Sequence, residues 1–192
     1  MRKLILTSVL SVMGICFSPL HGDDPAENHE RKEHVQYGSF FTRHEVLVRP
    51  EHPIIFDHHT VRPTRGIEHP EGTGDFILKE PGVYEVTYSA SLKCSGGYLA
   101  VTLDDVVIPG SEMYVGAPYQ LSTLSFVIKV CGEPNCCNHV LRVINNYPLT
   151  PGWFSHDLHL HAGGYDTVTA AIEIEKIAKC CKKCPCKDKD SK

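Results

Sequence analysis

The sequence predicts an all-β protein built as an antiparallel sandwich of two sheets. Apolar and polar residues alternate along several segments, and a period of two is that of a strand with one buried face. Turn dipeptides such as Pro81-Gly82 and Gly96-Gly97 separate these segments. No window carries the period of an amphipathic helix, so short strands at regular spacing indicate a sandwich or barrel. The alternation runs through residues 83–92, 99–103, 123–130 and 168–177.

Each predicted strand has an inner and an outer face. In the longest strand, Glu85, Thr87, Ser89 and Ser91 alternate with apolar residues and are expected to face solvent. The last strand is expected to end the fold at Ile177, where its apolar alternation stops. The side chains expected to share one core are Tyr84, Val86, Tyr88, Leu99, Val101, Phe126, Ile128, Ile172 and Ile174.

Five short motifs follow one another with a recognisable order and spacing. Gly82-Val83-Tyr84 opens the longest strand, Leu99–Leu103 follows it, and Ile108–Ser111 forms a hairpin turn. Upstream, Tyr37–Phe41 and Pro53–Asp57 take the places of a first and a second strand. In this order the chain resembles the C1q/TNF-like jelly-roll superfamily. Within that superfamily, it most resembles the C-terminal domain of collagen-like exosporium glycoproteins.

The resemblance implies a jelly-roll domain over residues 36–178 that assembles as a homotrimer and is a surface module, not an enzyme. The chain departs from that pattern in three features. No collagen-like repeat precedes the domain, the cluster Cys131–Cys137 interrupts a hairpin, and a Cys/Lys-rich tail over residues 179–192 follows the last strand. The two cysteine features suggest a specialised assembly.

The N-terminus has the pattern of a targeting segment. Arg2-Lys3 is a positive start, Leu4–Phe17 is an apolar run too short to span a bilayer, and Pro19 follows as a breaker. These features predict a signal peptide over residues 1–22, with a short membrane anchor as the alternative. Residues 23–35 are almost all polar or charged, so they are expected to form a disordered linker. No other segment is long enough to cross a membrane.

Composition restricts the classes of function. About 170 residues follow the leader, which is enough for one core but small for two. The formal net charge of −4 argues against a nucleic-acid partner, because such modules carry basic stripes. No nucleophile elbow or phosphate-binding loop is present, and the adjacent Ser155-His156-Asp157 does not make a triad. The chain is therefore predicted not to be an enzyme.

The twelve histidines suggest a metal site. If residues 156–161 form a strand, His159 and His161 share its outer face about 6 to 7 Å apart, a spacing at which two imidazoles can bind one zinc ion. Asp57-His58-His59 can supply further ligands. The alternative is an exposed polar strand face that binds nothing.

The cysteines are predicted to form disulfides. An even number behind a signal peptide indicates an oxidising compartment. The tail cysteines can pair among themselves, pair with Cys131–Cys137, or cross-link neighbouring chains. A thiolate zinc site at Cys181-x-x-Cys184 is the alternative. The candidates are Cys94, Cys131, Cys136, Cys137, Cys180, Cys181, Cys184 and Cys186.

These observations predict an exported homotrimer on a spore, envelope or cell surface. Its expected role is structural or adhesive, with tail disulfides linking it to copies of itself or to other surface proteins. A competing interpretation is a soluble ligand- or metal-binding module that uses the histidine-rich face. An enzyme of unrecognised type is the third. No cofactor is expected apart from zinc.

Overall fold

The computed structural model describes residues 35–93, 96–132, 138–147, 157–164 and 167–179. Within these ranges the chain forms thirteen strands and no helix. The strands are β1 (Tyr37–Thr42), β2 (Val46–Val48), β3 (His58–Val61), β4 (Ile67–Glu68), β5 (Phe76–Leu78), β6 (Gly82–Ser91), β7 (Gly97–Leu103), β8 (Val106–Val107), β9 (Met113–Val115), β10 (Leu121–Val130), β11 (His139–Asn145), β12 (Leu158–Leu160) and β13 (Ala170–Lys179).

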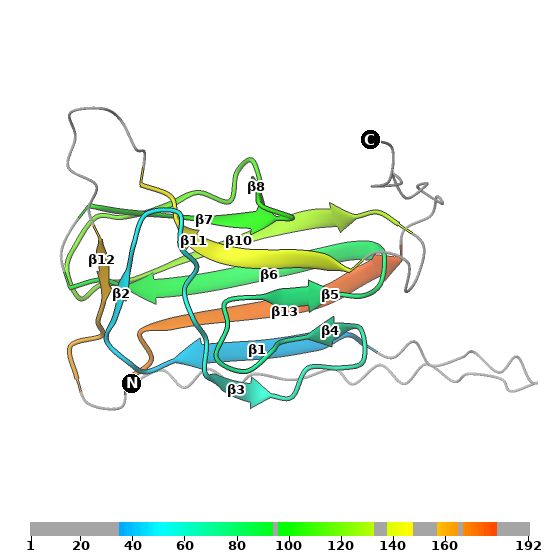
Figure 1. Cartoon of the computed structure of the whole chain (residues 1–192), viewed down its shortest axis with the longest axis horizontal. Helices are drawn as coiled ribbons and strands as arrows, with labels where there is room; N and C mark the ends of the chain where they lie inside the picture. Colours follow the sequence, from blue (N-terminus) through cyan, green and yellow to red (C-terminus); the bar gives the residue numbers. More distant parts are fainter. Residues whose placement is uncertain (1–34, 94–95, 133–137, 148–156, 165–166, 180–192) are drawn as a thin grey trace, which may run out of the picture. The chain divides into compact units, whose positions relative to one another are not determined.

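Two main antiparallel sheets form a sandwich, as the alternation predicts. The five-stranded sheet has the order β10-β6-β13-β1-β3, and Figure 1 shows β6 and β13 side by side with β1 next to β13. The second sheet has the order β4-β5-β11-β7-β8, and β9 also pairs with β7. A short β12-β2 pair completes the strands. Within the described ranges, no helix has the length and apolarity that crossing a bilayer requires.

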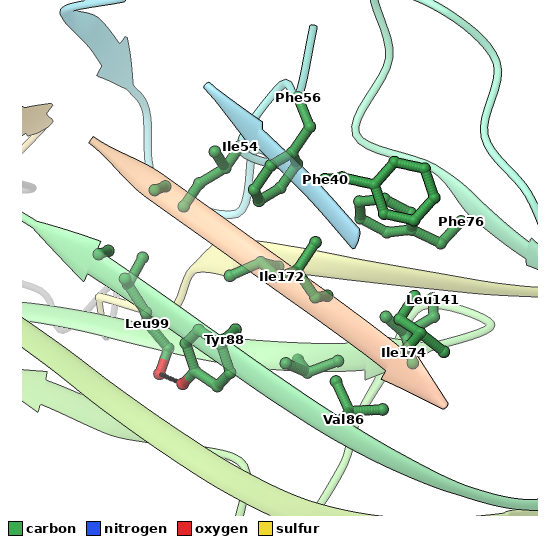
Figure 2. Packing of buried hydrophobic residues seen from close by; sticks show 14 of the residues in the cluster. Phe40, Ile54, Phe56, Phe76, Val86, Tyr88, Leu99, Leu141, Ile172 and Ile174 are labelled. Atoms are coloured by element: carbon green, nitrogen blue, oxygen red, sulfur yellow. Dashed lines mark hydrogen bonds between the residues drawn. The ribbon is translucent and has the colours of Figure 1, made fainter. Parts of the chain in front are cut away.

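The core lies between the two sheets. Tyr84, Val86 and Tyr88 of β6 are at most 1% exposed, whereas Glu85 between them is exposed, so the predicted inner face of this strand is confirmed. Leu99 and Leu141 of the second sheet are fully buried opposite them. Figure 2 shows part of this core, with labelled side chains from both sheets packed together: Val86, Tyr88, Leu99, Leu141, Phe40, Phe56, Phe76, Ile172 and Ile174. Each large apolar side chain buried in this way stabilises the fold by about 1.5–3 kcal/mol.

Two residues of the predicted faces differ from expectation. Phe126 packs against the core but is only partly buried, because β10 is the edge strand of its sheet and the sandwich covers it from one side. Ser91, expected on the solvent face, is 2% exposed. The backbones of Thr169 and His161 both bond to Ser91 at the end of β6 and cover it.

Two predicted strands are also corrected. Pro53–Asp57 is not a strand: Ile54 and Phe56 are buried, but only Pro53 forms an isolated bridge, to Ile144. The strands in this part of the chain are β2 and β3. The last strand begins at Ala170 and continues to Lys179, because a bulge between Lys176 and Ala178 restores its pairing with β6 beyond the apolar alternation.

Candidate functional site

The five-stranded sheet presents an outer face that points away from the core. Because the register is continuous from β1 through β13 and β6 to β10, its outward side chains align in rows across the sheet. The first row contains Phe41, Ala171, Ser89 and Thr123, the second contains Ser39, Glu173, Thr87 and Ser125, and the third contains Tyr37, Glu175, Glu85 and Val127.

The two ends of this outer face differ in charge. The first row carries no charged group, and Leu121, one step beyond it on β10, is 57% exposed. Carboxylates gather in the second and third rows, where Ser125 Oγ donates to Glu85 Oε1 over 3.1 Å. Burial raises the pKa of the Tyr37 phenol, a hydrogen bond with Ser39 opposes this, and the negative charge of Glu173 raises the pKa further. The outer face is therefore acidic at one end, and at the other, neutral end its own residues are uncharged, with the Arg43 guanidinium 5.1 Å from the centroid of the Phe41 ring.

A second feature is a cluster of His44, Asp57 and His58 beside the β3 edge of the same sheet. His44 lies in the turn between β1 and β2, Asp57 directly precedes β3, and His58 is its first residue. Asp57 Oδ2 is 2.9 Å from His44 Nε2 and 3.6 Å from His58 Nε2. One ligand atom from each residue lies within 4.8 Å of the other two. The topology thus brings together three groups of the kind that bind transition metals.

A cavity of about 430 Å³ adjoins this cluster. Its wall includes Asp57, His58, His59 and His69. Both ring nitrogens of His69 face backbone carbonyl oxygens at 2.8 Å, those of Asp75 and Phe56. A carbonyl only accepts, so a ring nitrogen of His69 bonds to it when that nitrogen carries the proton. Both nitrogens lie against the backbone, so His69 is not a candidate ligand in this wall.

His159 and His161 do not belong to that cluster, although His161 contacts Glu45, the residue after His44. His159 is exposed between the buried Leu158 and Leu160 of β12, so the predicted alternation is confirmed. His161 follows the strand, pairs through Nδ1 with Glu45 and packs its ring against Tyr119 at 5.3 Å. Within the described residues, the three-residue group close enough to hold a metal ion does not include either of them. Zinc binding by His159 and His161 stays a prediction.

Most of the predicted disulfide candidates lie outside the described residues, as do the signal peptide, nearly all of the linker and tail, and Ser155-His156. Cys131 is described and half-buried after β10, where its carbonyl oxygen is 2.8 Å from His139 Nε2. Its disulfide pairing stays a prediction.

Sequence reasoning pointed to Asp57 and His58 but missed His44. No motif links His44 to the Asp57-His58 pair, because a chain reversal through β2 and the loop after it separates them. The antiparallel pairing of Phe41 with His58 brings the end of β1 to the start of β3. The one signal that the sequence offered was the position of His44, three residues after the predicted strand Tyr37–Phe41.

No family model matches the chain, and no curated protein matches it. Among solved structures, the globular domain of zebrafish complement 1qA protein matches with a TM-score of 0.52 and 13% identity, over 77% of this chain and 100% of that one. Pika GITRL matches with a TM-score of 0.40 and 6% identity, over 76% and 99%. PRD1 vertex protein P5 matches with 0.43 and 14%, over 76% and 95%. The two-sheet sandwich and the first of these matches identify the fold as the C1q/TNF-like jelly roll.

Proposed function

We propose that this protein is an exported, non-enzymatic homotrimer with a structural or adhesive role on a cell, spore or envelope surface. The observation that carries the proposal is the neutral end of the outer face. There the first row and Leu121 of β10 are uncharged residues at the edge of the five-stranded sheet, and the Arg43 guanidinium borders them at Phe41. We assign this surface to contact between copies.

The edge strand supports a partner at this position. β10 spans ten residues, and within the described part of the chain it pairs with β6 alone. A long exposed edge with outward apolar side chains invites uncontrolled pairing, and proteins therefore cover such edges. A second copy that packs against Leu121 and Thr123 covers the edge strand and removes the apolar side chain of Leu121 from water.

Charge determines which part of the outer face is dehydrated. Burying Glu85, Glu173 and Glu175 against a neighbour would cost several kcal/mol for each uncompensated carboxylate, on the order given for buried ions. The first row carries no such cost. The trimer contact is therefore centred on Leu121, Thr123 and Ser89, away from the Arg43 guanidinium at Phe41, and the acidic end stays hydrated.

Export and covalent linkage complete the proposal. The pattern of Arg2-Lys3 and Leu4–Phe17 supports secretion, and an oxidising exterior favours disulfides. Cysteines in the tail, residues 179–192, then join neighbouring chains. The absence of a catalytic motif in the sequence supports a non-enzymatic role.

Light scattering and gel migration of the full chain test this function together. With reductant, light scattering should return three times the protomer mass. Without reductant, a denaturing gel should show disulfide-linked multimers that collapse to one band when thiol is added. A protomer mass across micromolar concentrations would remove the trimer. A single monomer band in both gels would remove the covalent linkage.

A further inference from the structure

We propose that His44, Asp57 and His58 form a binding site for one divalent transition-metal ion, zinc foremost, at the β3 edge of the five-stranded sheet. This site differs from the pair formed by His159 on β12 and His161 directly after it. It lies within one protomer, so it does not depend on the trimer.

The distances fit a single ion. A tetrahedral zinc ion lies about 2.0–2.2 Å from nitrogen and oxygen ligands, which sets neighbouring ligand atoms roughly 3.3 Å apart. The two nitrogen-to-oxygen distances in the cluster, 2.9 and 3.6 Å, lie on either side of that separation. The third distance, between the two ring nitrogens, is at most 4.8 Å, so binding needs the exposed His44 ring to move inward by at most about 1.5 Å. Two imidazoles and a carboxylate are also ligands that suit zinc better than calcium or magnesium.

An unpaired oxygen of Asp57 gives a second, independent observation. Asp57 Oδ1 is buried and has no hydrogen-bond partner among the described residues. A buried carboxylate oxygen without a donor is costly, because nothing replaces the water it has lost. A dication at Oδ2 offsets this cost, since it neutralises the charge that both oxygens share.

The surroundings hold two of the three ligands in place. His58 pairs with Phe41 across the β1–β3 ladder, and the two rings lie 5.2 Å apart at 32°. Asp57 has a side chain only 27% exposed, whereas the His44 side chain is 71% exposed. The third ligand, His44, thus comes from an exposed turn, whereas Asp57 and His58 are held in place by their surroundings. Three protein ligands leave a fourth position toward solvent for water or for a group from a partner.

The neighbouring residue provides a matched control. His59 follows His58 directly but is paired opposite Phe40, whose side chain is in the core, so it takes the other face of β3. A variant at His59 removes one imidazole from the same strand without removing a ligand. His159 on β12 and His161 directly after it provide a second control.

The test is zinc titration of the full chain by calorimetry, after its cysteines have been alkylated so that thiolates cannot bind the ion. Cobalt substitution adds a spectroscopic readout of nitrogen and oxygen ligation that is independent of any activity. The wild-type chain should bind one ion at this site. The variants H44A, H58A and D57N should each lose at least about tenfold in affinity, the lower end of what even an outer-shell change costs.

The control variants His59→Ala and His159→Ala/His161→Ala should bind as the wild-type chain does. Thermal melting of each metal-free variant shows whether it is folded, and Asp57→Asn, which keeps the side-chain shape, covers the case in which an alanine variant does not fold. The proposal is overturned if the wild-type chain binds no zinc, or if H44A, H58A and D57N bind as it does. It is equally overturned if the affinity falls in the His159/His161 variant instead.

Discussion

The phenol of Tyr88 donates a hydrogen bond of 2.7 Å to the backbone carbonyl of Ser111, which is 0% exposed. Ser111 Oγ in turn accepts from the Val101 N–H at 3.0 Å and donates to the Val101 carbonyl at 3.1 Å. One buried serine therefore joins β6, β7 and the turn before β9. Burial raises the pKa of Tyr88, and the charge of Glu112 adds to the effect, so the phenol stays protonated and keeps its proton for donation.

Replacing Ser111 with alanine should destabilise the fold. The change leaves the buried Val101 N–H without its acceptor, a loss of about 1–3 kcal/mol in the free energy of unfolding. Urea denaturation of the full chain under reducing conditions measures it. The exposed Thr60→Ala on β3 is the control and should change the free energy by less than about 0.5 kcal/mol. Equal stability of the Ser111 and Thr60 variants would show that the buried bonds add nothing.

Glu80 and Lys176 predict a pH-dependent contribution to stability. Lys176 Nζ donates to Glu80 Oε2 over 2.9 Å and lowers the pKa of Glu80, burial opposes this, and the Gln36 amide lowers the pKa further. A carboxyl whose folded pKa is lowered stabilises the fold above its unfolded pKa, and the contribution is lost as pH falls through the folded value.

Glu80→Gln should therefore lower the free energy of unfolding at pH 7 by about 1 kcal/mol, since the pair is partly exposed. The difference from wild type should shrink once the pH is below about 4.5, the ordinary pKa of a glutamate. Chemical denaturation at several pH values measures both. Glu68→Gln, in the more exposed pair with Lys79, is the control and should show a smaller effect. A difference that stays constant down to acidic pH would contradict the assignment to Glu80.

Deleting residues 180–192 should leave the fold intact. The last described pairing joins Lys179 to Gly82, so the deletion removes no described strand, and its expected cost is below about 0.5 kcal/mol. Without reductant, the shortened chain should run mostly as monomer on a denaturing gel, whereas the full chain runs as linked multimers. Monomers from both forms would refute cross-linking by the tail, and multimers from both would place it in other cysteines.

Local alternation was enough to predict the inner faces of the long strands. In β6 the two-residue period of Tyr84, Val86 and Tyr88 follows from backbone geometry, which does not depend on the rest of the chain. The misses depended on long-range contacts. Ser91 is buried because distant segments bond to it, and Phe126 is partly exposed because β10 is an edge strand. Neither fact is encoded near the residue.

The candidate metal site likewise combines residues that are adjacent in the sequence with one that only long-range pairing brings close. Asp57-His58 stands out because two ligand types are adjacent in the sequence, whereas His44 joins them only through the β1–β3 pairing. Pro53–Asp57 was mistaken for a strand because Ile54 and Phe56 alternate and are buried. Their side chains fill the core without a ladder partner beyond Pro53. A core-filling loop and a half-buried strand have the same apolar pattern.

The central claim is that the neutral end of the outer face joins three copies of this chain. Sedimentation of the reduced full chain tests it most directly when wild type is compared with Leu121→Lys/Thr123→Lys. Both side chains are exposed in the protomer, so the change should not unfold it, but two buried ammonium groups in each contact should prevent assembly. The control Val106→Lys/Tyr114→Lys alters exposed residues of the second sheet. Wild type and control should sediment as trimers and the β10 variant as a protomer; a wild-type protomer, or a β10 variant that remains trimeric, would contradict the claim.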